Sequence, residues 1–275
     1  MRYVRHAPAP PLDRNVDHLW YYDGLEVAHL RERVLPNGTF TLIFNLSETT
    51  RCLFPRDLDG PAQPFKRAWV SGAHSAYIVI DSLPNSSLMG VHFHPGGAAR
   101  FLRIPGGELM DRVVELDAVW GPAASAIHLA LLEAPDPQAK LRLLESFLLQ
   151  RHRALADPDP AIQLALQLFS SQPCIHRIDH VVHATGISHR RFIERFTRQV
   201  GLGPKRFCRI LRFQQVLQRL QRKQPVSWAA LAADCGYYDQ AHFIQDFRAF
   251  SGMNPSRYLV ERGEHLNFVP VTFSR

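Results

Sequence analysis

Residues 233–258 read ADCGYYDQAHFIQDFRAFSGMNPSRY, and this stretch predicts two short helices joined by a tight turn. Gly236 is the small residue that such a turn needs, and the Asp239 carboxylate can cap the next helix. In that helix an apolar stripe faces a core, formed by Phe243, Phe247 and Phe250. The opposite face carries side chains that can hydrogen-bond base edges or phosphates: Gln240, His242, Gln245 and Arg248. The stretch therefore predicts a helix-turn-helix unit with its recognition helix.

The same pattern occurs once more, 51 residues earlier in the chain. The first copy contains Phe192, Ile193, Phe196, Gly201, Pro204 and Phe207, which match Phe243, Ile244, Phe247, Gly252, Pro255 and Tyr258. The turn glycines Gly186 and Gly236 differ by only 50, so one residue is inserted in the second turn. The first unit then has a scaffold helix over 178–185, Ser188 as N-cap and a recognition helix over 189–200. The repeat indicates a duplicated structural unit.

A long helix is predicted to join the two units. It covers residues 204–222 and begins with a proline, which the first turn of a helix tolerates. Its last 18 residues span about 27 Å at about 1.5 Å per residue. Recognition helices that enter successive major grooves of B-DNA lie about 34 Å apart. Once the units at its ends are added, this spacing favours a protein that reads two successive grooves.

Charge is distributed unevenly along the 275 residues. Residues 161–275 contain 16 Lys and Arg against 7 Asp and Glu, whereas residues 1–160 contain 16 against 18. The whole basic excess therefore lies in the part with the repeat, which suggests a polyanionic partner for that part. In the first recognition helix, Arg190 and Arg191 lie in the first turn, where base edges are contacted, and Arg198 lies nearer the phosphates. Glu194 projects from the same face.

The first 120 residues alternate short β-prone runs with turns. Residues 32–35 and 39–46 read as two strands joined by a tight turn at 36–38, and further strands are expected at 67–71, 76–80 and 88–94. This spacing favours a barrel or sandwich of the cupin-like kind. Helices over 123–134 and 136–155 follow, the second with an apolar stripe that packs on the β-rich part or on another subunit. The predicted fold class is thus α+β, in two domains.

The predicted domain limits follow from these patterns. A β-rich sensor and dimerisation domain covers residues 1–156, a Pro- and Asp-containing linker covers 157–160, the double helix-turn-helix domain covers 161–265, and a tail covers 266–275. Among the chemistry-bearing motifs, His92 and His94 are weak candidates for metal ligands, because period-two spacing puts both on one face of a strand. Neither His74 nor Glu108 is placed convincingly as a third ligand, so two polar residues on a strand remain the alternative. We expect no cofactor.

Other classes of protein find little support. No catalytic triad, Gly-rich phosphate loop or carboxylate pair stands out, so we expect no enzyme. No apolar run approaches the roughly 20 residues that span a bilayer, and the N-terminus lacks the apolar core of a signal peptide. The four widely spaced cysteines are typical of reduced thiols: Cys52, Cys174, Cys208 and Cys235.

At this point the residues resemble a known family. GISHRRFIERFTRQVGLGPKRF, RILRFQQVLQRL and CGYYDQAHFIQDFRAFSGMNPSRY, within residues 161–260, look like the AraC/XylS-type DNA-binding domain. RERVLPNG and VHFHPGGAARFL look like the β-rich N-terminal domain of one uncharacterised AraC-type subgroup. The resemblance implies a bacterial, cytoplasmic and nucleoid-associated regulator that binds promoter DNA. Such regulators often act as dimers and contain an N-terminal domain that senses small molecules or self-associates.

The resemblance also implies contact positions. It places base or backbone contacts on His189, Arg190, Ile193 and Glu194 and on Gln240, Ala241, His242 and Gln245. Many members have arginine where Glu194 and Gln245 stand, and a small residue where Val182 stands, so the resemblance carries over the fold but not a sequence preference. Together with the side chains already named, the predicted DNA-binding residues are Ser188, His189, Arg190, Arg191, Ile193, Glu194, Arg198, Gln240, Ala241, His242, Gln245 and Arg248.

These observations predict a sequence-specific transcriptional regulator. Its partners would be double-stranded promoter DNA, RNA polymerase, a small-molecule effector at the N-terminal domain and a second copy of the chain, with no membrane. Two alternatives remain open at this stage. One is a metal-dependent β-barrel enzyme with a DNA-binding tail, and the other is a regulator controlled by a protein partner only.

Overall fold

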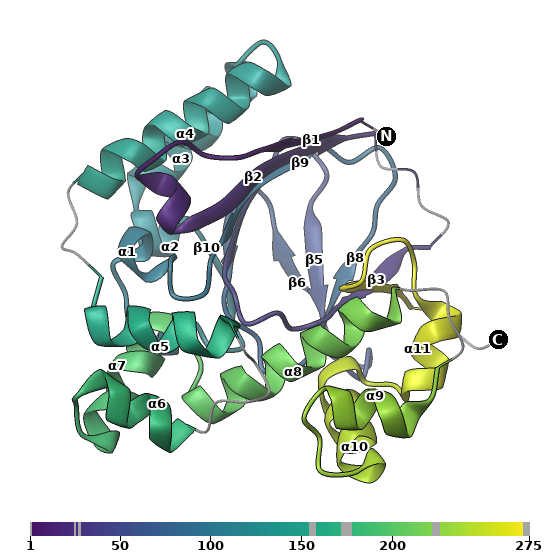
Figure 1. Cartoon of the computed structure of the whole chain (residues 1–275). Helices are drawn as coiled ribbons and strands as arrows, with labels where there is room; N and C mark the ends of the chain where they lie inside the picture. Colours follow the sequence, from purple (N-terminus) through teal and green to yellow (C-terminus); the bar gives the residue numbers. More distant parts are fainter. Residues whose placement is uncertain are drawn as a thin grey trace.

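Two antiparallel β-sheets make up most of the N-terminal part of the chain in the computed structural model (Figure 1). The structure describes residues 2–24, 26, 29–153, 158–171, 178–221 and 226–271. The six-stranded sheet has the order β1 (Arg2–His6), β2 (Val16–Asp23), β9 (Leu88–Phe93), β4 (Thr41–Asn45), β7 (Ala68–Ser71), β10 (Val113–Glu115). The five-stranded sheet has the order β11 (Phe268–Pro270), β3 (Arg31–Val34), β8 (Ile78–Asp81), β5 (Arg51–Phe54), β6 (Gln63–Phe65). The mainly-β expectation for this part is confirmed.

The strands on either side of residues 36–38 lie in different sheets. β3 pairs with β8 and β11, whereas β4 pairs with β7 and β9. The tight turn expected there therefore does not join two paired strands, and it instead carries the chain from one sheet to the other. Gly38, at a φ of 77°, allows this change of direction. The alternation of the sequence identified both strands correctly, but pairing is a non-local property that alternation does not encode.

Helices cover the outer face of the six-stranded sheet (Figure 1). They are α1 (Ala99–Leu102), α2 (Asp117–Trp120), α3 (Pro122–Glu133) and α4 (Pro137–Arg153), with the short 3₁₀ turns η1 (Leu12–Arg14) and η2 (Gly106–Leu109). The predicted apolar stripe of α4 is buried through Leu141, Leu144 and Leu148, and α4 packs against α1, α3 and β2. Packing of this stripe onto the β-rich part is therefore confirmed. A subunit interface at α4 stays a prediction.

The C-terminal part is helical throughout most of its length. Its helices are α5 (Pro160–Ser171), α6 (Ile178–Thr185), α7 (His189–Val200), α8 (Pro204–Leu220), α9 (Trp228–Asp234), α10 (Gln240–Ser251) and α11 (Pro255–Glu261). Helices α6 and α7 form one helix-turn-helix unit and α9 and α10 the other, with α8 between them, as predicted. The Ser188 and Asp239 side chains accept the backbone N–H groups of Arg191 and His242, so both predicted N-caps are present. Residue 157 of the expected linker, Cys174 and Arg222 lie outside the described residues.

The two parts share one hydrophobic core. Fully buried residues of the six-stranded sheet belong to the same apolar cluster as the aromatic residues of α7, α8 and α10. Glycines lie at close approaches between the parts: a Cβ at Gly201 would lie 2.7 Å from the Phe40 ring, and one at Gly38 would lie 3.1 Å from the Phe207 ring. At these two positions the backbone of one part therefore lies directly against an aromatic ring of the other.

The strand β11, which follows α11, pairs with the β-rich part. Residues 266–275 were expected to be a tail, and within them β11 pairs antiparallel with β3 along Phe268↔Val34 to Pro270↔Glu32. The Gln214 side chain of α8 donates to Pro36 O at 2.7 Å and to Asn267 Oδ1 at 2.9 Å. The strand that follows the second unit is thereby tied both to a sheet edge and to the connecting helix.

Candidate nucleic-acid interface

Helix α7 separates an apolar face from a charged face. Phe192, Phe196 and Val200 are completely buried. The predicted contact residues Ser188, His189, Arg190, Arg191, Glu194 and Arg198 are all exposed, and Ile193 is 41% exposed. Because α7 meets η2 at its C-terminal end, where Thr197 and Arg198 lie close to Gly106 and Gly107, the first turns of the helix remain open to solvent. The structure thus brings the seven predicted residues of the first unit together on one accessible surface.

Arg195 belongs to this surface although it was not among the predicted contacts. Together with Arg191, Glu194 and Arg198 it lines a hollow of about 350 Å³. Its Nη1 donates to Asp159 Oδ2 at 3.1 Å, and the other oxygen of that carboxylate accepts the Ala161 N–H at 3.0 Å. The spacing of four from Arg191 and three from Arg198 was a signal that could have found it, since such residues are neighbours on a helix. The Asp159 carboxylate that holds Arg195 lies in the linker, 36 residues earlier, so the sequence of α7 gave no sign of this contact.

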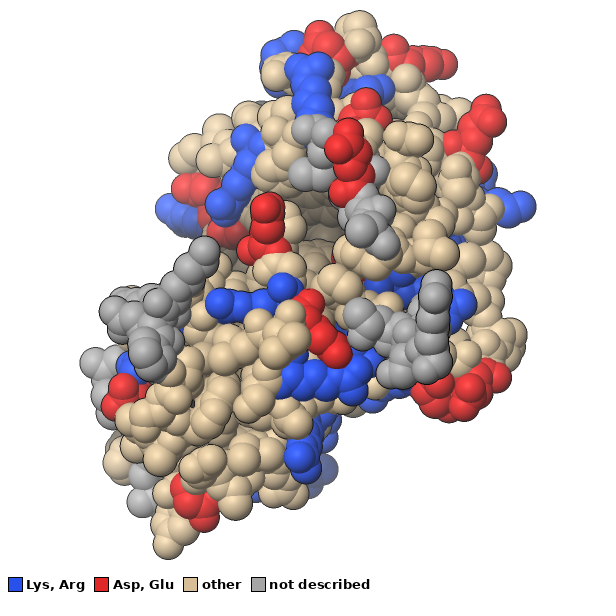
Figure 2. Space-filling view, turned by 90° about the vertical axis from the view of Figure 1, so that its right-hand side faces the viewer, with Lys and Arg blue, Asp and Glu red and all other residues tan. Residues whose placement is uncertain are grey.

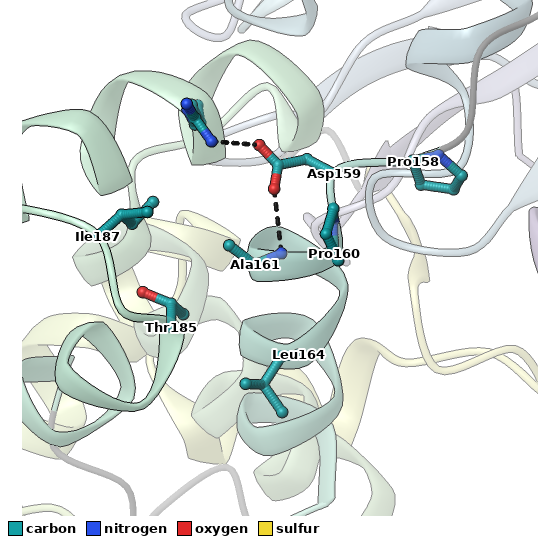
Figure 3. A pocket seen from close by; sticks show the side chains of 8 residues that line it. Pro158, Asp159, Pro160, Ala161, Leu164, Thr185 and Ile187 are labelled. Atoms are coloured by element: carbon teal, nitrogen blue, oxygen red, sulfur yellow. Dashed lines mark hydrogen bonds and ion pairs between the residues drawn. The ribbon is translucent and has the colours of Figure 1, made fainter.

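A surface pocket of about 720 Å³ lies beside this ion pair, where the start of α5 meets the turn between α6 and α7 (Figure 3). The residues that line it are Pro158, Asp159, Pro160, Ala161, Leu164, Thr185, Ile187 and Arg195. Figure 3 shows Asp159 at its upper edge and Leu164 and Thr185 lower on its two sides. The pocket therefore adjoins the turn that leads into α7, with an apolar lining and one polar edge.

Helix α10 presents a less charged surface than α7. Gln240, Ala241, Gln245 and Arg248 are exposed, as predicted for contact residues. His242 is half-buried: its ring lies edge-on to Tyr237 at 5.3 Å between centroids, and its Nε2 is 3.9 Å from Asp246 Oδ2. Of the five predicted residues of the second unit, His242 is thus the least accessible. The assignment of all twelve residues to DNA stays a prediction.

Asp246 is a buried acid on the inner side of α10. It is 2% exposed, and Arg209 of α8 donates to its two oxygens at 2.6 and 3.3 Å. The hydrogen bond to Asp246 raises the pKa of Arg209. Removing a carboxylate from water is costly unless it is paired, so this bidentate contact fixes α10 on α8. The pair orients the second recognition helix relative to the connecting helix.

Of the two histidines that were weak metal candidates, His92 lies on β9 and His94 follows its last residue. The His92 ring contacts the hydroxyl oxygens of Thr39 and Thr41, both at 3.2 Å, and the His18 ring at 5.3 Å between centroids. Burial lowers the pKa of His92 to about 4. Among the described residues, no group of three or more His, Cys, Asp or Glu side chains is placed to hold a metal ion. No helix among the described residues has the length and apolar character needed to cross a bilayer.

Comparisons with known proteins agree with this geometry. Residues 181–260 match the family model described as "Helix-turn-helix domain", and residues 4–115 match "Domain of unknown function (DUF6597)". An uncharacterized HTH-type transcriptional regulator of Haemophilus influenzae is 28% identical over 116 residues, which are 42% of this chain and 39% of that protein. The HTH-type transcriptional regulator MtrA of Neisseria gonorrhoeae is 32% identical over 87 residues, 32% of this chain and 29% of that protein. The chain thus spans well under half of either relative.

Solved structures show more distant similarity. ToxT from Vibrio cholerae, bound to (E)-4-(8-methylnaphthalen-1-yl)but-3-enoic acid, aligns over 94% of this chain and 99% of its own at 9% identity, with a TM-score of 0.48. An AraC-type regulator from Chromobacterium violaceum aligns over 38% of this chain and 94% of its own at 22% identity, with a TM-score of 0.35. These likenesses are too distant to assign a ligand here.

The fold and the site define a protein with two helix-turn-helix units on one connecting helix. Residues 181–260 belong to the part that matches the helix-turn-helix family model, and the β-rich part before them, over residues 4–115, matches a domain of unknown function.

Proposed function

We propose that this chain is a DNA-binding transcriptional regulator whose two recognition helices, α7 and α10, enter successive major grooves. The observation that carries the proposal is the accessibility of their polar faces in an arrangement where both units are docked on the β-rich part. Contacts with that part involve Thr197 and Gly201 at the end of α7 and Phe250 and Gly252 at the end of α10. The first turns of both helices, where base edges are read, stay free.

The proposed division of labour follows the predicted limits: a sensor part over 1–156, a linker over 157–160, the DNA-reading part over 161–265 and the tail over 266–275. Within the sensor part, side chains from both sheets form a separate cluster around Phe65 and Trp69. Trp20, Tyr22, Ile43, Leu53 and Ile78 pack against this cluster but are only half-buried. Incomplete burial of apolar side chains between two sheets supports a space that a small molecule could fill.

Two further observations support an effector at this place. Arg51, on the same strand as Leu53, is 5% exposed and ion-paired with Asp81 at 2.8 Å, while its Nη1 has no hydrogen-bond partner. A buried donor without a partner is costly, and a bound acceptor would satisfy it. Figure 2 draws the right-hand side of the molecule as seen in Figure 1 and shows a hollow there, at the height of the two sheets.

Dimer formation, contact with RNA polymerase and a cytoplasmic, nucleoid-associated location complete the proposal and rest on the family resemblance.

The test of DNA reading uses the full-length chain, because separating the helical part would expose Phe207 and other residues of the shared core. A random duplex pool would be selected with the protein, and the recovered duplex titrated at several salt concentrations. We expect protection of two sites about one helical turn apart and an affinity that falls steeply as salt rises. The proposal is overturned if the protein recovers no duplex, or if its affinity for the duplex does not change with salt concentration.

A matched pair of variants sharpens this test. Arg190→Ala should weaken binding to the selected duplex by about 1–3 kcal/mol and relax the preference at one base pair. Arg142→Ala is the control, since Arg142 is also an exposed helical arginine but lies on α4. If the Arg190→Ala and Arg142→Ala variants bind the duplex with equal affinity, Arg190 does not contact the DNA. For the sensor part, thermal shifts of the full chain in a small-molecule library distinguish ligand control from control by a protein partner only.

A further inference from the structure

Tyr238 is the most exposed of the large hydrophobic residues described, with 93% of its surface accessible. It stands directly before Asp239, the N-cap of α10, in the turn of the second helix-turn-helix unit. Among the described residues it has no hydrogen bond, ion pair or ring contact with any other side chain. The fold therefore gives this aromatic side chain no internal role.

Comparison of the two units shows that Tyr238 is the inserted residue. In the first unit only Ile187 separates the turn glycine, Gly186, from the N-cap. Ile187 is half-buried and packs against the core. In the second unit Tyr237 takes this inward role: it is 5% exposed, and its ring contacts Phe243 at 5.5 Å between centroids. Tyr238 has no counterpart in the first unit and projects to solvent instead.

The second unit also has few cations with which to hold a duplex. On α7, exposed arginines stand at 190, 191, 195 and 198, whereas on α10 the only exposed Lys or Arg is Arg248, in the last turn. The unit with fewer charges is the one with the additional exposed phenol. A tyrosine O–H is among the side-chain groups that donate to phosphate oxygens in protein–DNA interfaces, and such contacts fix the register of the protein on the duplex.

We propose that Tyr238 is a DNA-contacting residue whose phenol O–H donates to a backbone phosphate at the rim of the second major groove. This inference rests on the proposed function. The position fits the contact because the N-terminal residues of a recognition helix lie in the groove, and a residue just before the N-cap then lies at the groove edge, beside the backbone. The contact anchors α10 so that Gln240 and Ala241 reach base edges.

The test measures binding of full-length wild type, Tyr238→Phe and Tyr238→Ala to one labelled duplex of about 30 base pairs, long enough for two grooves one turn apart and recovered from a random pool with the wild type. Phenylalanine keeps the ring and removes only the donor, so we expect about tenfold weaker binding, as for loss of a hydrogen bond to a charged acceptor. Alanine should weaken binding at least as much. Tyr3→Phe is the control, because Tyr3 is 52% exposed but lies on β1.

Two readouts separate this contact from a structural role and from a charge contact. The phenol is uncharged and releases no counterion, so Tyr238→Phe should leave the slope of log affinity against log salt unchanged. Arg198→Ala, which removes a cation predicted to lie near phosphate, should reduce that slope by about 1. Bound duplex should also protect Tyr238, and not Tyr3, from nitration by tetranitromethane, as located by peptide mass spectrometry. The melting temperature should stay unchanged, because Tyr238 is 93% exposed and makes no hydrogen bond, ion pair or ring contact with the described residues.

The outcomes distinguish the inference from the proposed function. If the wild type binds and protects two grooves but Tyr238→Phe binds equally well, with Tyr238 nitrated as fast in the complex as in the free protein, the inference is overturned and the function stands. If the wild type recovers no duplex, both are overturned. Weaker binding by Tyr238→Phe with an unchanged salt slope and protection from nitration supports the contact.

Discussion

Gly252 offers a direct test of how the second unit is held. It ends α10 with a φ of 73°, and a Cβ at this position would lie 2.5 Å from Cε1 of Tyr77, a residue of the β-rich part. The Tyr77 backbone N–H also donates to Phe250 O at 2.9 Å. Gly252→Ala should therefore destabilise the chain in two ways, through the backbone conformation and through the contact with Tyr77.

The two contributions can be separated with Gly186→Ala. Gly186 has nearly the same φ, 69°, but a Cβ there would meet no atom within 4 Å. The left-handed conformation alone costs a residue other than glycine about 1–2 kcal/mol. Overpacking at a close contact costs about 1–3 kcal/mol more. We expect Gly186→Ala to lose only the first amount of unfolding free energy and Gly252→Ala to lose both.

Urea unfolding of the full chain measures both losses, provided that unfolding is a single transition. A double-mutant cycle with Tyr77→Ala isolates the contact, since in that background Gly252→Ala should cost no more than Gly186→Ala. Equal losses for the two glycine variants in the presence of Tyr77 would refute the docking of α10 on the β-rich part. An undiminished loss in the Tyr77→Ala background would refute the assignment of the contact to that ring.

Three further predictions follow from buried and paired charges. Arg209→Ala leaves the buried Asp246 carboxylate without its partner and should cost about 3–5 kcal/mol of unfolding free energy, most of which Asp246→Asn in the same chain should restore; no recovery would contradict the pairing. Burial lowers the pKa values of His74 and His92 from 6.5 to about 4, so the unfolded chain takes up these protons first as pH falls. Unfolding free energy should then be constant above about pH 6.5 and decrease toward pH 4 by up to about 3 kcal/mol per histidine, with a flatter profile for His92→Gln. Asp159→Asn releases Arg195 while keeping a residue that can cap α5, so DNA binding should become a few-fold tighter with a salt slope steeper by up to about 1; an unchanged slope would show that Arg195 does not reach phosphate.

The helical part could be predicted in detail from the sequence. The positions of Gly186, Gly236, Ser188 and Asp239 specify turns and caps by local backbone chemistry, and the phenylalanine spacing specifies the inward faces. These signals lie within about one or two helical turns of the residues that they position. The internal repeat then confirmed each local assignment with a second copy. The exposed contact surface of α7 followed from the same spacing, because the side opposite a buried stripe is the side that faces solvent.

The tertiary structure decided which residues far apart in the sequence pair with or contact each other. The stretches around residues 31–34 and 41–45 read as neighbouring strands, yet they belong to different sheets, and β11 returns from the end of the chain to pair with β3. Asp159 holds Arg195 across 36 residues, and Arg209 holds Asp246 across 37. Such pairs depend on how elements pack, and periodicity carries no information about packing partners far along the chain.

The sequence by itself determined that two helix-turn-helix units exist and which faces they expose, because helix formation, capping and amphipathic patterning are local. Only the tertiary structure decided that the β-rich part and both units share one core, and that Gly201 and Gly252 are positions of direct contact with Phe40 and Tyr77. It also decided that Tyr238 is almost fully exposed to solvent. Close packing is the physical reason, since a side chain's burial and contacts depend on every element that reaches it and not only on its own helix.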